Sequence, residues 1–68
     1  MNIKCKHPNA IWYHFTPLYV AHVALVNDRY RYEIREQSTG ACVERFGQCH
    51  TLPEAKSAVL KSVSVLPN

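Results

Sequence analysis

The stretch RYRYEIRE, residues 29–36, decides the fold of this chain of 68 residues. Tyr30, Tyr32 and Ile34 alternate strictly with charged residues, and alternation with a period of two is typical of a β-strand. The three apolar side chains share one face of this strand, while the charged side chains share the other. The sequence therefore predicts a half-buried strand whose charged face is open to solvent or to a partner.

A second strand is predicted directly before this stretch. Residues 18–26, LYVAHVALV, form a short Val-rich run between Pro17 and the pair Asn27-Asp28, and its length and flanks are typical of a strand. Asn27 and Asp28 both tolerate the left-handed backbone conformation that a tight hairpin turn requires. We expect the two strands to form an antiparallel hairpin.

A third strand is predicted over residues 41–46, after a turn in which Gly40 can take a positive φ. Ala41 and Val43 are expected to point inward in this strand. Phe46 is out of phase with them, which predicts a bulge or the end of the strand at this point.

A capping motif at Thr51 marks the start of a C-terminal helix. The Thr51 side chain can accept a hydrogen bond from the backbone amide of Glu54, and the Glu54 side chain can reach back to Thr51. Pro53 lies in the first turn, where its missing N–H group costs nothing. Apolar residues then recur at three- and four-residue steps until Pro67, and they are Leu52, Ala55, Val59, Val63 and Leu66. This stripe predicts a helix over 51–66 that packs on a sheet.

Together these elements predict an α+β fold of the order βββα. Residues 17–50 form a small three-stranded antiparallel sheet, residues 51–66 form the helix on one of its faces, and residues 1–16 form an N-terminal arm or an extra strand. We expect one domain, 1–68, because a chain this short buries only about 60% of the surface that it exposes when unfolded. Hydrophobic residues make up 47% of the chain and charged residues 19%, which favours an ordered domain over intrinsic disorder.

The predicted helix leaves the opposite face of the sheet uncovered, and this face is basic. The strand at 29–36 places Arg29, Arg31, Glu33 and Arg35 there, and the chain has a formal net charge of +3. Guanidinium groups fit phosphate oxygens and guanine, and the DNA major groove is wide enough to admit strands. The alternative is a solvated face with cross-strand ion pairs, such as Arg35 with Glu44.

Several residues of this region match a known pattern, and they are Glu33-Ile34-Arg35-Glu36, Gly40, Gly47 and Thr51-Leu52-Pro53-Glu54-Ala55. An E-I-R-D strand, a turn glycine and the helix start G-x-x-x-T-x-x-E-A occur in the DNA-binding domains of plant ethylene-response factors and in integrase arm-binding domains. The chain resembles these domains over roughly residues 29–60, with one extra residue between Gly40 and Gly47.

The resemblance implies a sheet that lies in the DNA major groove, with Glu33 and Arg35 facing the DNA. Arg29, Arg31 and Arg45 are additional contacts by geometry. The strand at 18–26 lacks the R-G-V-R segment and the tryptophans that the plant domains have there, and we therefore expect weak DNA binding.

We expect a non-enzymatic binding protein that uses no cofactor and no small-molecule substrate. The alternative to a nucleic-acid partner is a host protein complex, because free-standing domains this short often come from phages and mobile elements. Such a protein would inhibit a host machine, for example a defence complex of anti-CRISPR type, by mimicking or competing for its nucleic-acid or protein surface. A double-stranded-RNA-binding domain is disfavoured, since it needs an N-terminal helix and a lysine-rich helix start that Lys56 alone does not supply.

Cysteine and histidine residues form no credible metal or catalytic motif. The chain has no C-x-x-C pair, and the spacing of Cys5 with His7, and of Cys42 with Cys49-His50, is poor for zinc. Cys49 and His50 are neighbours in the sequence, but this does not make a catalytic pair, because a nucleophile also needs an oriented base and an oxyanion site. The odd number of cysteines argues against a secreted disulfide framework and favours a reducing, cytoplasmic location.

The N-terminal region imitates a signal peptide, since lysines precede the mostly apolar residues 10–26. His14, Pro17 and His22 interrupt this stretch, and a spanning helix needs roughly 20 predominantly apolar residues. We therefore expect neither export nor a membrane partner, and we expect His14 and His22 to be packed or surface residues.

Overall fold

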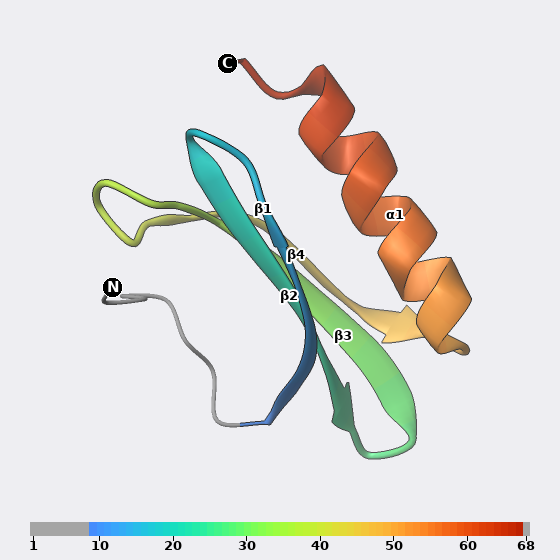
Figure 1. Ribbon diagram of the computed structural model, residues 1–68. Coiled ribbons are helices and arrows are strands. Elements are labelled where there is room, and N and C mark those ends of the chain that lie inside the picture. Colours follow the sequence, from blue (N-terminus) through green and yellow to red (C-terminus); the bar gives the residue numbers. More distant parts are fainter. Residues whose placement is uncertain (1–8, 68) are drawn as a thin grey trace.

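The computed structural model describes residues 9–67, in which four strands form one antiparallel sheet and a single helix covers one face of it (Figure 1). The elements are β1 (Ala10–Phe15), β2 (Tyr19–Val26), β3 (Arg29–Glu36), β4 (Cys42–Cys49) and α1 (Leu52–Val65). The strands lie in the sheet in chain order, β1-β2-β3-β4. The α+β class is confirmed, but the predicted number of three strands is wrong.

The additional strand is β1, which pairs antiparallel with β2 and places Trp12 opposite Val23 and Phe15 opposite Val20. Residues 10–15 do form the extra strand that was one of two possibilities for this segment. Large apolar or aromatic side chains occupy both faces of β1, so the sequence shows no period of two and gives no clear strand signal. The rest of the predicted arm, residues 1–8, lies outside the described residues.

The hairpin between β2 and β3 is confirmed. Asn27 and Asp28 have φ angles of 52° and 63°, which are the two positive values that the favoured two-residue hairpin turn requires. The register runs without a break from Val26 opposite Arg29 to Tyr19 opposite Glu36. This register places Tyr32 opposite Val23 and Ile34 opposite Ala21, so that the core residues of both strands share the face that meets α1.

Strand β4 differs from its prediction in length and phase. Gly40 has the expected positive φ, 76°, but the strand continues beyond Phe46 to the buried Cys49. Ala41 and Val43 are exposed, so their predicted inward orientation is wrong. A register shift between Cys42 and Glu44 explains the error, since it adds a residue and changes the phase of the alternation. A second register shift follows Phe46, where a bulge was one of the two predicted possibilities.

The start of α1 follows the predicted capping motif with one difference. The amide of Glu54 donates to Thr51 Oγ1 at 3.2 Å, as expected. The Glu54 carboxylate accepts from the amide of His50 at 2.9 Å rather than from that of Thr51. No helix in the described part of the chain is long and apolar enough to cross a membrane.

The core lies between the sheet and α1. Tyr32 and Ile34 are buried against the helix and Tyr30 is partly buried there, as predicted. The largest fully buried side chains are Ile34, Val23, Val59 and Cys49. The predicted helical stripe is confirmed, because Ala55, Val59 and Val63 are buried while Leu52 and Leu66 pack at its ends.

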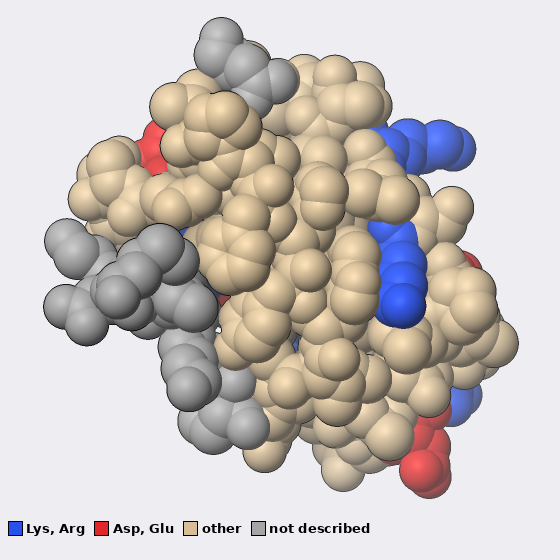
Figure 2. Space-filling view, in the orientation of Figure 1, with Lys and Arg blue, Asp and Glu red and all other residues tan. Residues whose placement is uncertain are grey.

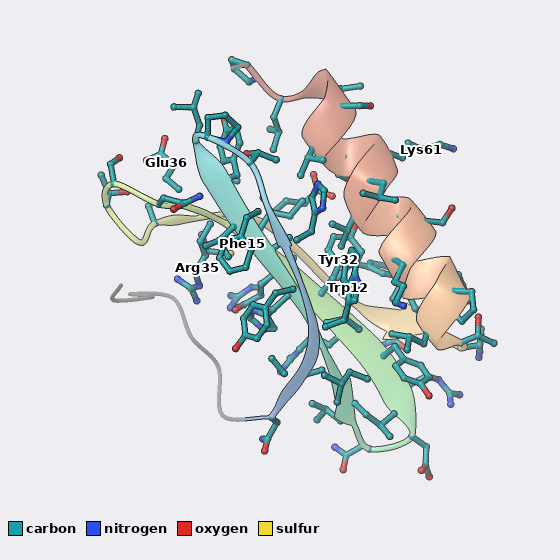
Figure 3. The ribbon with its side chains drawn as sticks, in the orientation of Figure 1. Trp12, Phe15, Tyr32, Arg35, Glu36 and Lys61 are labelled. Carbon is teal, nitrogen blue, oxygen red and sulfur yellow. The ribbon has the colours of Figure 1, made fainter. Side chains whose placement is uncertain are left out.

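Trp12 extends this core toward the edge of the sheet. Its ring packs against the buried cluster between the sheet and α1, as Figure 3 shows. Lys56 of the helix lies with its Nζ atom 5.5 Å from the centre of the Trp12 ring, a cation–π contact that ties α1 to β1.

Candidate functional site

The face of the sheet away from α1 collects all five residues that the sequence singled out. Arg29, Arg31, Glu33 and Arg35 alternate on β3 with the side chains that enter the core. Arg45 of β4 lies directly opposite Glu33 and joins them on this face. We call this the helix-free face.

Glu33 is the centre of an ion-pair cluster on the helix-free face. Its Oε1 atom lies 3.2 Å from Arg35 Nη2 and 3.7 Å from His22 Nε2, and its Oε2 atom lies 3.9 Å from Arg45 Nη1. Only 12% of the Glu33 side chain is exposed, compared with 71% of the Arg45 side chain. Glu33 is therefore enclosed by Arg35, Arg45 and the His22 imidazole rather than presented to a ligand.

Arg35 is also held in place within the protein. Its Nη1 atom donates to the carbonyl oxygen of Gly40 at 2.8 Å, while Nη2 donates to Glu33. The pair of Arg35 with Glu44 that the sequence suggested is wrong. Glu44 lies on the other face, because the first register shift of β4 places it opposite Ile34, where it accepts hydrogen bonds from Tyr32 and Ser62.

Arg29 and Arg31 are exposed on the helix-free face, and neither has a carboxylate within ion-pairing distance in the described part of the chain. The Arg31 side chain lies across Gly47, where a Cβ atom would be only 3.5 Å from its Nε atom. The two arginines border a shallow hollow of about 200 Å³, whose other lining residues are Val26, Asn27, Gly47 and Gln48. We call Arg29, Arg31 and Arg45 the basic border of the helix-free face.

An aromatic pair occupies the opposite side of this face. The rings of Tyr13 and Phe15 stack with their centres 6.0 Å apart and an angle of 20° between their planes. Figure 3 shows Phe15 and Arg35 on the side of the sheet away from α1, and Figure 2 shows that the surface around β1 carries few charges. Sequence reasoning missed this pair because it did not place residues 10–15 on a defined face.

The centre of the helix-free face is closed, so the expectation of a wholly uncovered face is wrong for β2. Val20, His22 and Ala24 are 5%, 3% and 0% exposed. Val20 is short and lies in the register between the long side chains of Phe15 and Arg35. The accessible surface of this face is therefore divided between the aromatic pair on β1 and the basic border on β3 and β4.

The thiols and histidines do not assemble into a reactive centre within residues 9–67. No group of three or more His, Cys, Asp or Glu side chains in this range is placed to hold a metal ion, and the candidates Cys5 and His7 lie outside it. Cys42 is exposed and Cys49 is buried. Burial, with a contribution from the Glu54 carboxylate, raises the pKa of the Cys49 thiol above its ordinary value and makes it a poorer nucleophile.

Comparison of the chain with known proteins and structures identifies no relative. No family model gives a significant match to this sequence, and no curated protein or solved structure matches the chain. The resemblance to ethylene-response-factor and integrase arm-binding domains therefore stays a prediction.

Proposed function

We propose that this protein is a non-enzymatic nucleic-acid-binding protein that contacts phosphate groups through its basic border. The observation that carries the proposal is the placement of three exposed arginines on one side of the sheet, where only Arg45 among them pairs with a carboxylate, the largely enclosed Glu33. Arg29 and Arg31 have no carboxylate partner among the described residues, so their guanidinium groups keep hydrogen-bond donors available for phosphate oxygens. The face is therefore electrostatically suited to an anionic polymer.

The five residues have different parts in this proposal. Arg29, Arg31 and Arg45 contact the ligand, because they are exposed. Glu33 and Arg35 are positioning residues, since Arg35 holds the turn at Gly40 and Glu33 draws the cationic side chains together. This assignment departs from the resemblance, which places both Glu33 and Arg35 against the DNA.

The test is fluorescence anisotropy with labelled single-stranded and duplex oligonucleotides over a range of salt concentrations. Arg31→Ala should weaken binding and lower the slope of log K against log salt by about 0.7–0.9, the value for one lost phosphate contact. Lys61→Ala is the matched control, because Lys61 is an exposed cation on α1, away from the helix-free face (Figure 3). Absence of binding at low salt, or equal effects of the two variants, would contradict the proposal.

A protein partner is the second candidate, and the outer edge of β4 supports it. Val43 and Phe46 are 42% and 47% exposed, and no further strand pairs with β4 within the described residues. A free edge of this kind can accept a strand from a partner such as a host protein complex that a phage or mobile-element protein blocks. Capture that resists nuclease and is abolished by Val43→Lys, but not by Arg31→Ala, would favour this candidate.

A further inference from the structure

The core does not explain the aromatic pair on the helix-free face. Phe15 is 45% exposed and points away from the buried cluster between the sheet and α1. Trp12, in contrast, is used by the core on the other face of the same strand. An exposed aromatic ring, stacked on Tyr13 and on the same face as four arginines, has the composition of a base-stacking surface.

The spacing of the strands sets the distance between the aromatic pair and the basic border. Neighbouring strands lie about 4.8 Å apart, so β1 is about 10 Å from β3 and about 14 Å from β4. The buried Val20 and His22 lie between them and offer a ligand little to contact. A ligand that uses both sides of this face therefore has to present flat apolar groups at one side and negative charge at the other.

Unpaired nucleotides satisfy both requirements. In a duplex the faces of the bases are stacked on one another, so its outer surface offers phosphates to the basic border but no base to Phe15. A single strand exposes its bases, which stack on aromatic side chains regardless of sequence, while its phosphates remain free for arginine.

We propose that the helix-free face binds single-stranded nucleic acid, with a base stacked on Phe15 and the phosphates held by the basic border. This inference rests on the proposed nucleic-acid-binding function and names its ligand class. The recognised chemistry is the same in DNA and RNA, and both are arms of the test.

The experiment compares Phe15→Ala with Phe46→Ala. Both phenylalanines are exposed to a similar degree, 45% and 47%, but Phe46 packs against Tyr32 on the face that α1 occupies. Anisotropy is measured with labelled dT12 and rU12, with a 12-base-pair duplex, and with a 12-unit abasic strand that keeps its phosphates but has no bases. Melting curves of each variant ensure that only folded protein is compared.

Phe15→Ala should weaken binding of dT12, rU12 or both by about 5- to 150-fold, the cost of one lost stacking contact, and leave duplex binding unchanged. Phe15→Trp should restore the affinity, and Phe46→Ala should have little effect. The abasic strand should bind wild-type protein as weakly as dT12 binds the Phe15→Ala variant. Equal affinity for single strand and duplex, or an unchanged affinity of Phe15→Ala, would overturn the inference while leaving the proposed function intact. Absence of binding to every probe would overturn both.

Discussion

The Tyr32 hydroxyl donates a 2.8 Å hydrogen bond to Glu44 Oε2, and the Ser62 hydroxyl of α1 donates to the same oxygen at 2.7 Å. One carboxylate thus connects β3, β4 and the helix at the margin of the core. Hydrogen bonds to an ionised acceptor are stronger than neutral ones, and this oxygen is satisfied by two of them. The contact ties α1 to β4, whose Phe46 is 47% exposed.

Tyr32→Phe removes one of these hydrogen bonds without changing the packing of the ring. The free energy of unfolding should fall by about 1.5–3 kcal/mol, the range for a hydrogen bond to a charged group. Urea denaturation measures the change. Ser64→Ala is a suitable control, because the Ser64 hydroxyl only donates to the carbonyl of Lys61 on the exposed side of the helix. A loss no larger than that of the control would show that Glu44 does not stabilise the fold through Tyr32.

Alkaline pH should destabilise the protein. Burial, and then the hydrogen bond to Glu44, raise the pKa of Tyr32 above its ordinary 10.0, and burial raises the pKa of Cys49 above 9.0. The folded state holds both protons more tightly, so their stabilising contribution is complete below pH 9 and is lost as the pH rises through the folded-state values. Urea titrations between pH 7 and 11 should show this decline, and Tyr32→Phe with Cys49→Ala should make it shallower. If stability declined equally steeply in the double variant, titratable groups other than Tyr32 and Cys49 would cause the decline.

Ile34 is the central side chain of the core, with 0% exposure. Ile34→Val should cost about 0.5–1.5 kcal/mol and Ile34→Ala about 2–5 kcal/mol, because the larger deletion leaves a cavity that the small domain can only partly close. Val43→Ala, at an exposed position of β4, should change stability little. Thermal melts followed by circular dichroism test this order, and equal melting temperatures for Ile34→Ala and Val43→Ala would contradict the core assignment.

The two described thiols should differ in reactivity. In a Cys5→Ser background, a disulfide reagent such as DTNB should label the exposed Cys42 rapidly. Cys49 is buried and its raised pKa lowers the fraction of thiolate, so it should react only when urea opens the fold. Equal rates of labelling for Cys42 and Cys49 under native conditions would show that the end of β4 is not packed beneath α1.

Glu33→Gln distinguishes this structure from the resemblance to major-groove binders. Removing the negative charge should lower stability by about 1–3 kcal/mol, because Arg35 exchanges a charged acceptor for a neutral amide oxygen. It should strengthen nucleic-acid binding, since Arg45 is released toward the ligand. Glu36→Gln, which removes the same charge from the other face of β3, is the control. Weaker binding of Glu33→Gln would instead indicate that Glu33 itself contacts the ligand.

Sequence reasoning was most accurate where local chemistry decides the structure. The alternation of β3, the turn at Asn27-Asp28 and the cap at Thr51 each depend on a few neighbouring residues, and all three are present in the structure. Strand β1 was ambiguous because both of its faces are apolar, and β4 was misphased because its two register shifts depend on pairing with β3. The phase of Phe46 predicted a bulge as one of two possibilities, and a register shift does follow it, but no pattern in the sequence indicated the shift between Cys42 and Glu44.

The sequence predicted which face of the sheet carries the candidate site, but not how the side chains of the site contact one another. Alternation alone brings Arg31, Glu33 and Arg35 to one side. The enclosure of Glu33 depends on His22 and Arg45 as its cross-strand neighbours, and this requires the registers on both sides of β3. Phe15 belongs to the site because β1 pairs with β2. No local pattern in residues 10–15 predicted this pairing.

The order β1-β2-β3-β4 also shapes how the chain reaches its native state. Each strand pairs with a neighbour in the sequence, so the sheet can grow outward from the turn at Asn27-Asp28 by closing short loops, each of which costs little chain entropy. Such local connectivity favours rapid folding compared with sheets built from distant segments. The docking of α1 is a longer-range contact, because the Tyr19 hydroxyl donates to the carbonyl of Pro67, 48 residues away. The helix-free face is therefore built from strands that neighbour one another in the sequence, whereas the core also needs the long-range docking of α1.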